Sequence, residues 1–144
     1  PLTVAFMLEK LEPKKGDEIL DVGSGSGWTT TLLAHIVGEK GKVTGLELIP
    51  ELVNFGQDNL LKYNFSQAHI EQTERGLFGE PKQKVNKILV SASAKRLPEE
   101  FILQLKPNGI LVLPMGNSVF RISKDNHGNI DVKEFPGFVF VPLL

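Results

Sequence analysis

The residues best suited to do chemistry lie in one short stretch, Asp21-Val22-Gly23-Ser24-Gly25-Ser26-Gly27. It joins an apolar run at residues 19–22, which is typical of a buried strand, to a helix expected at about 28–37 and closed by Gly38. Ligands of open α/β sheets bind at the carboxyl ends of the strands. Glycines let a backbone turn tightly and approach a ligand closely. The stretch therefore predicts a small-molecule site.

The spacing of the glycines excludes two common classes of nucleotide-binding loop. A dinucleotide-binding G-x-G-x-x-G starting at Gly23 would need a third glycine at position 28, which is Trp28. A P-loop is excluded as well, because no Gly-Lys-Ser/Thr follows. Glu47 lies 20 residues after Gly27, at the end of a second strand expected at 41–47, where its carboxylate can accept hydrogen bonds from ribose hydroxyls. Together these favour a nucleoside ligand without a pyrophosphate over an ordinary tight turn followed by a solvated acid.

Helical and strand patterns alternate along most of the chain. Helices are expected at about 4–11, 28–37, 50–63 and 98–106, and strands at 19–22, 41–47, 68–71, 87–91 and 110–113. The rhythm then changes to two strands, 119–122 and 138–141, with a turn at 125–129 between them. Repeated β-α units with a terminal hairpin predict a mostly parallel sheet with an antiparallel edge. We expect one domain over residues 1–144.

Composition sets the remaining limits. The chain has 144 residues, no Cys, and 16 Lys and Arg against 17 Asp and Glu, for a net charge of −1. These numbers exclude a disulfide framework and a thiol nucleophile, and they argue against binding nucleic acid through bulk charge. His35, His69 and His127 are scattered without metal-ligand spacing. No apolar run could span a membrane and the first residues lack a signal peptide, so we expect a cytoplasmic protein.

The glycine stretch with Glu47 resembles the S-adenosylmethionine site of class I methyltransferases. In more detail, the whole chain resembles protein-L-isoaspartate O-methyltransferases, in the order of that family. The segments that carry this resemblance are Val4-Ala5-Phe6-Met7, Leu11-Glu12-Pro13, Gly25-Ser26-Gly27-Trp28-Thr29-Thr30, Ile88-Leu89-Val90-Ser91-Ala92, Leu105-Lys106-Pro107-Asn108-Gly109, Leu113-Pro114-Met115-Gly116 and Phe140-Val141-Pro142-Leu143.

The resemblance implies a doubly wound, Rossmann-like α/β fold with a seven-stranded sheet in the order 3-2-1-4-5-7-6. The last strand should insert antiparallel between the fifth and sixth. It also implies methyl transfer from S-adenosyl-L-methionine to the carboxylate of an isoaspartyl peptide or protein, with S-adenosyl-L-homocysteine as product. The residues expected to hold the cofactor are Asp21, Gly23, Ser24, Gly25, Ser26, Gly27, Trp28, Thr29, Glu47, Leu48 and Ser91.

The chain departs from the family pattern in three places. The family's Thr-Ile-Ser segment, whose Ser is its active-site residue, precedes the position of Pro1. The Asp of the family's Gly-Asp-Gly, which contacts the adenine, corresponds to Arg75. The family's closing C-terminal segment follows the position of Leu144. The catalytic residue therefore stays unassigned, with Ser91 a candidate near the methyl group or a strand-end cap, and Ser93 a weaker one. A cofactor-binding module with little or no catalysis is the alternative function.

Two further features have two interpretations each. Trp28 either packs beside the cofactor or fills the core. Residues 75–96 hold six cations and one acid, which suits an acidic substrate or a solvated surface. Asp17 and Glu18, although adjacent carboxylates, are expected in a solvated turn at the far end from the loop. Finally, apolar residues in the first helix and at the chain end favour a homodimer built on that helix or the terminal hairpin.

Overall fold

Adjacent residues of the central strands belong to different hydrophobic clusters. Ile19, Leu89 and Val112 belong to one cluster, whereas their neighbours Leu20, Ile88 and Leu111 belong to another, and all six are buried. Side chains alternate between the two faces of a strand. The sheet therefore has a covered apolar surface on both faces. The computed structural model describes residues 2–75 and 83–139.

Apart from the last strand, the elements follow one another as the periodicity predicts. The helices are α1 (Leu2–Leu11), α2 (Trp28–Val37), α3 (Pro50–Leu61) and α4 (Glu99–Leu103). The strands are β1 (Glu18–Val22), β2 (Lys42–Glu47), β3 (Ala68–Gln72), β4 (Val85–Val90), β5 (Leu105–Met115), β6 (Ser118–Lys124) and β7 (Ile130–Pro136). The helix expected at 98–106 is shorter than predicted, because β5 already begins at Leu105.

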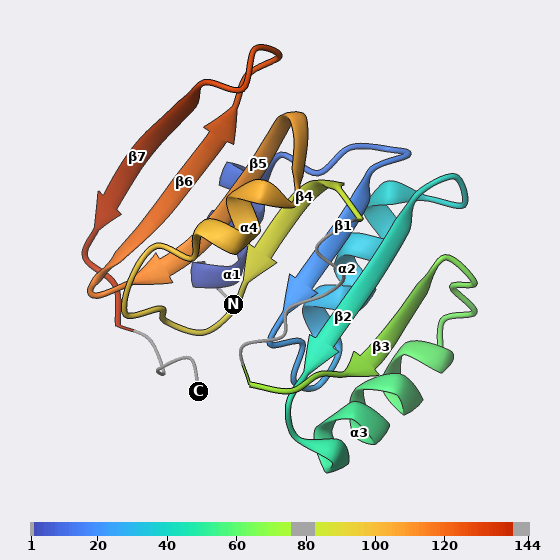
Figure 1. Cartoon of the computed structure of the whole chain (residues 1–144). Coiled ribbons are helices and arrows are strands. Elements are labelled where there is room, and N and C mark those ends of the chain that lie inside the picture. Colours follow the sequence, from blue (N-terminus) through green and yellow to red (C-terminus); the bar gives the residue numbers. More distant parts are fainter. Residues whose placement is uncertain (1, 76–82, 140–144) are drawn as a thin grey trace.

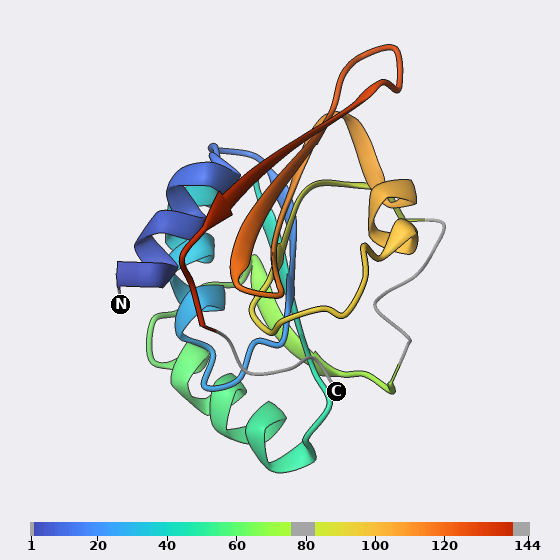
Figure 2. The same cartoon turned by 90° about the vertical axis from the view of Figure 1, so that its left-hand side faces the viewer.

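The helices cover the two faces of the sheet unequally. Viewed along the sheet, α1, α2 and α3 lie on one side and the short α4 lies on the other (Figure 2). The first cluster fills the space under the three helices, and the second surrounds Phe101 of α4. Among the described residues, no helix has the length and apolar character needed to cross a membrane.

The sheet has seven strands in the order β3-β2-β1-β4-β5-β6-β7 (Figure 1). The first five strands run parallel, and β6 and β7 are antiparallel to their neighbours. The mostly parallel α/β fold, the order 3-2-1-4-5 and the antiparallel terminal hairpin are thus confirmed. The predicted placement of the last strand between the fifth and sixth is wrong, because β6 itself pairs with β5.

Two tight connections explain this order. Met115 pairs with Ser118 across a turn at residues 116 and 117, so β6 folds directly back along β5. The Asp125 carboxylate then accepts the N–H groups of His127 and Asn129, and this turn returns the chain along β6 as β7. The last strand was predicted at 138–141, but the structure has it at Ile130–Pro136. Residues 138 and 139 lie in no strand, and 140 and 141 fall outside the described residues.

An ion pair closes the end of the sheet opposite the glycine loop. Lys87 Nζ donates to Asp17 Oδ2 at 2.7 Å, and the two side chains are only 7% and 13% exposed. The same Asp17 oxygen accepts the backbone N–H of Lys14. Asp17 is therefore not in a solvated turn, as the sequence suggested. It fixes the amino end of β4 against the segment that leads into β1.

Removing one partner of this pair should destabilise the fold strongly. Lys87→Met leaves the Asp17 charge buried without its cation, and we expect the free energy of unfolding to fall by about 3–5 kcal/mol in urea titrations. Lys87→Met combined with Asp17→Asn should recover most of that loss. The control is Lys106→Met, which breaks an exposed pair with Glu18 at 3.5 Å and should cost at most about 1 kcal/mol. Equal losses in the two single variants would contradict this account.

Candidate functional site

The glycine loop follows β1 and is tied to the end of β2. The N–H groups of Gly23 and Ser24 both donate to the carbonyl of Leu46, at 2.8 and 3.1 Å. Gly23, Gly25 and Gly27 have φ values of 79°, 54° and 83°, in the left-handed region that side chains disfavour. Glycine at these three positions therefore allows the sharp reversal between β1 and α2.

One end of the loop is packed and the other is open. A Cβ placed on Gly27 would meet the carbonyl oxygen of Gly56 in α3 at 2.7 Å, so the two backbones touch. A Cβ on Gly23 would find nothing nearer than the Cβ of Ser91 at 3.9 Å, and one on Gly25 nothing nearer than 4.0 Å. Gly27 thus serves helix packing, and the space in which a ligand could approach lies at Gly23 and Gly25.

The Glu47 carboxylate holds the open end of the loop in position. Its Oε2 accepts the N–H of Gly25 at 2.8 Å, and its Oε1 accepts those of Leu48 and Ile49 at 3.0 and 3.2 Å. A carboxylate offers about four acceptor positions, so about one remains for a ligand. Sequence reasoning placed Glu47 beside the loop but missed that it also holds the loop in position.

Asp21 lies beneath the loop and is fully buried. Its Oδ2 accepts the hydroxyl groups of Thr29 and Thr30 at 2.8 and 2.7 Å, whereas its Oδ1 has no hydrogen-bond partner among the described residues. Burial raises the pKa of this carboxyl from 3.8 to about 6, against the lowering effect of the two hydroxyls and with a smaller raising effect from Glu47. An acceptor oxygen without a partner is unfavourable in a protein interior and favourable once a donor reaches it.

The other residues predicted from the sequence are placed around these two acids. Ser91 is exposed, and its N–H donates to Val22 at 2.9 Å, so the end of β4 lies beside Gly23. Ser24 is buried and its hydroxyl has no hydrogen-bond partner within residues 2–75 and 83–139, and Leu48 is half-buried. Ser26 is exposed, and its carbonyl accepts the side-chain amide of Asn59 at 2.9 Å.

Trp28 does not fill the core, because 49% of its surface is exposed. It lines a hollow of about 160 Å³ together with Asn59, Lys62 and Tyr63, on the side of the loop that faces the end of α3. Its role as a cofactor contact stays a prediction. Thr29, by contrast, is buried against Asp21, which explains the hydroxyl at this position.

Three residues of the site were missed from the sequence. Thr30 shares Asp21 with Thr29, Gly56 makes room for Gly27, and Asn59 holds Ser26. A glycine inside an otherwise regular helix, such as Gly56, is the one signal that could have pointed to close packing. The contacts of Thr30 and Asn59 depend on how the helices are placed, and no local pattern shows that.

Only some of the cations in residues 75–96 are exposed. Arg75, Lys84, Lys95 and Arg96 are exposed, but Lys87 is buried and paired with Asp17. Lys82 lies outside the described residues. The interpretation of the stretch as a solvated surface or as an attraction for acidic substrates therefore rests on four of its cations.

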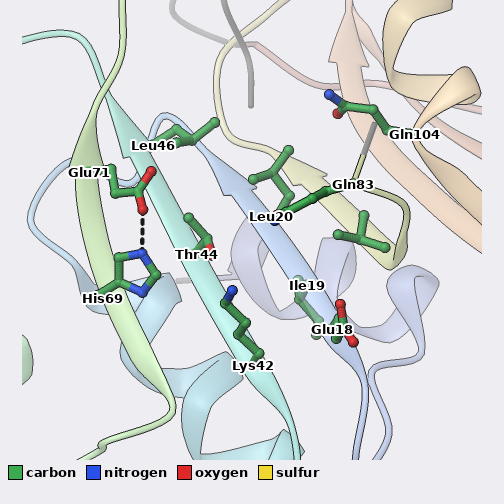
Figure 3. Close-up of a pocket in the computed structure, with 11 residues that line it drawn as sticks. Glu18, Ile19, Leu20, Lys42, Thr44, Leu46, His69, Glu71, Gln83 and Gln104 are labelled. Carbon is green, nitrogen blue, oxygen red and sulfur yellow. Dashed lines mark hydrogen bonds and ion pairs between the residues drawn. The ribbon is translucent and has the colours of Figure 1, made fainter. Parts of the chain in front are cut away.

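A separate cavity of about 340 Å³ lies on the sheet face opposite α1, α2 and α3 (Figure 3). Thr44 and Leu46 of β2 line it beside His69 and Glu71 of β3, whose side chains are hydrogen-bonded to each other. No residue of the stretch 21–27 lines it, and neither does Glu47. The cavity is thus distinct from the loop site.

A mostly parallel sheet, with this glycine loop after its first strand and a carboxylate after its second, defines a Rossmann-like class I methyltransferase. The sequence model of one family, "Protein-L-isoaspartate(D-aspartate) O-methyltransferase", matches residues 1–144. The chain belongs to this family.

Individual relatives of the chain support the same family assignment. The chain is 38% identical over 149 residues to a protein-L-isoaspartate O-methyltransferase of Pyrococcus horikoshii, covering all of this chain and 67% of the relative. It is 38% identical over 150 residues to one from Thermococcus onnurineus, with the same coverage. A Plasmodium falciparum protein-L-isoaspartate O-methyltransferase, solved with S-adenosyl-L-homocysteine, superposes with a TM-score of 0.88 at 28% identity, over all of this chain and 74% of that one.

The buried Asp21 should make stability depend on pH. Between pH 3.8 and about 6 the folded state keeps a proton that the unfolded state has lost, so stability falls as pH rises through this window and is level above it. Asp21→Asn removes this dependence. Relative to wild type, the variant should gain about 2 kcal/mol between pH 4 and pH 7, measured by urea unfolding.

The control for this experiment is Asp58→Asn on the exposed surface of α3. Its stability relative to wild type should be nearly the same at both pH values. A wild type and an Asp21→Asn variant that keep a constant difference across the window would show that folding does not raise the pKa of the Asp21 carboxyl.

Proposed function

We propose that residues 1–144 act as a single S-adenosyl-L-methionine-binding domain that methylates the carboxylate of isoaspartyl residues in peptides or proteins. The observation that carries this proposal is the open side of the loop at Gly23 and Gly25, bordered by the buried carboxylates of Asp21 and Glu47. Family membership supports the reaction, and it favours an enzyme over a binding module without catalysis.

The residues present fit the cofactor. Asp21 Oδ1 and the Ser24 hydroxyl are buried without hydrogen-bond partners among the described residues, so polar groups of a ligand would satisfy them. Glu47 keeps about one acceptor position for a ribose hydroxyl. Two buried acids also suit a ligand that carries positive charge, since each charge stabilises its opposite. Ser91, whose Cβ is the nearest atom to a Cβ placed on Gly23, and Leu48, whose N–H donates to Glu47, complete the proposed cofactor contacts.

When bound, S-adenosyl-L-methionine supplies a sulfonium methyl group, and transfer leaves S-adenosyl-L-homocysteine. An acceptor carboxylate is already ionised at neutral pH, so the chain need not supply a strong base. Its task is alignment, and holding two reactants in line can lower a barrier by roughly 7–11 kcal/mol. Ser91, exposed at the end of β4 beside Gly23, is our candidate for orienting the acceptor.

Partners and location follow from the same proposal. The exposed cations Arg75, Lys84, Lys95 and Arg96 favour a substrate that carries carboxylates. With a net charge of −1, the chain is not suited to nucleic acid. We propose a cytoplasmic enzyme that forms a homodimer, and the interface is considered in the next section.

Loss of the Glu47 carboxylate should weaken cofactor binding. Glu47→Ala removes a charged acceptor and releases the N–H of Gly25, and a charge-assisted hydrogen bond is worth about 1.5–3 kcal/mol. We expect S-adenosyl-L-homocysteine to bind about 10–150-fold more weakly in titration calorimetry. Glu51→Ala, which removes an exposed acid from the first turn of α3, is the matched control and should bind normally. Unchanged affinity in Glu47→Ala would remove Glu47 from the site.

The reaction itself is tested with two peptides of the same sequence, one containing isoaspartate and one containing aspartate. With S-adenosyl-L-methionine carrying a labelled methyl group, we expect base-labile methyl ester to form on the isoaspartyl peptide alone. Cofactor binding without transfer to either peptide would support the binding module instead. Failure to bind the cofactor would overturn both functions.

A further inference from the structure

The outer edge of β7 is the most exposed regular backbone of the described chain. The hairpin of β6 and β7 projects from the body of the molecule (Figure 1). Residues 130–134 are all exposed, with Ile130 at 43% and Val132 at 50%. No described strand pairs with the far side of β7. An open edge of this kind is a template for another strand.

The hydrogen bonds of the hairpin show which backbone groups this edge offers. At one end the N–H of Asp125 donates to Asn129, and at the other the N–H of Gly137 donates to Asn117. The two pairs continue the register of β6 and β7 by one residue beyond each of its ends. Because hydrogen-bonded pairs alternate along an antiparallel ladder, Asp131, Lys133 and Phe135 bond to β6. The N–H and C=O groups of Ile130, Val132 and Glu134 therefore point outward.

One antiparallel register lets this edge pair with itself. With Val132 opposite Val132 of a second copy, Ile130 stands opposite Glu134 and Glu134 opposite Ile130. All three outward N–H and C=O pairs then meet partners. A shift that brings Glu134 opposite Glu134 instead sets Val132 against Pro136, which has no N–H. The proline thus excludes that neighbouring register.

The charges along β7 agree with the same register. Asp131 then stands opposite Lys133 of the second copy, and Lys133 opposite Asp131. These are the positions between hydrogen-bonded pairs, where side chains across an antiparallel ladder lie closest. Charged residues on an edge usually prevent pairing when like charges meet. Here Asp131 and Lys133 lie on either side of Val132. A twofold rotation about Val132 therefore places Asp131 of each copy opposite Lys133 of the other.

We propose that the outer edge of β7 is a homodimer interface, in which two copies join their sheets through antiparallel β7 strands with Val132 on the twofold axis. The interface covers Ile130 and Val132, which are 43% and 50% exposed. It lies at the opposite edge of the sheet from β2 and β3, so cofactor binding and dimer formation are separable (Figure 1).

A charge exchange tests the register. Sedimentation equilibrium over a wide concentration range should show association of the 15.9 kDa chain to a dimer. Asp131→Lys and Lys133→Asp each place like charges opposite each other and should weaken the dimer by roughly tenfold or more. The double variant Asp131→Lys/Lys133→Asp restores two opposite pairs and should restore the dimer. A monomer at every concentration, or a double variant no better than the single ones, would overturn the proposal.

A proline variant tests the edge independently. The N–H of Val132 points outward, so Val132→Pro removes it without breaking the ladder to β6, and the dimer should be lost. Val132→Ala keeps the N–H and is the matched control, which should still associate. Circular dichroism and binding of S-adenosyl-L-homocysteine should be unchanged in both. A Val132→Pro variant that associates like Val132→Ala would show that the interface lies elsewhere.

Discussion

The hydrogen bond from the Gly25 N–H to the Glu47 carboxylate is the contact on which the site depends. It joins the loop after β1 to the end of β2, and the same carboxylate receives the first N–H groups of the segment that leads into α3. A loop with three left-handed glycines has few conformational restraints of its own. Glu47 therefore fixes the conformation of the loop and also supplies negative charge to the site. Removing its side chain abolishes both roles at once.

The two ends of the strands have different tasks. At the carboxyl ends, Asp21 Oδ1 and the Ser24 hydroxyl are buried without hydrogen-bond partners in the described part of the chain, which is unfavourable until a ligand supplies them. At the amino ends, the buried Lys87 pairs with Asp17, whose side chain is only 13% exposed. The unpaired atoms of Asp21 and Ser24 therefore lie at the end of the sheet where a ligand can approach. This asymmetry is typical of binding sites built on an otherwise complete core.

The sequence predicted those parts of the molecule that depend on local pattern. Gly23, Gly25 and Gly27 predicted a tight turn, and the apolar runs predicted the parallel strands. The terminal strands were harder, because β7 is exposed on both faces and its residues Ile130–Pro136 lack an apolar run. The pairing of Lys87 with Asp17 joins residues 70 positions apart, so charge patterning along the chain could not show it. Trp28 was misjudged as possible core because a large aromatic usually favours burial.

The touching backbones of Gly27 and Gly56 have a consequence for interpreting natural variation in this chain. A Cβ on Gly27 would lie 2.7 Å from the Gly56 carbonyl oxygen, and a Cβ on Gly56 would lie 2.9 Å from the Gly25 carbonyl oxygen. A side chain at either position therefore requires the loop and α3 to move apart. A change at residue 56, in the middle of a helix and with no ligand to contact, would displace the loop and reduce affinity for the cofactor. A survey confined to residues lining the site would class such a variant as neutral.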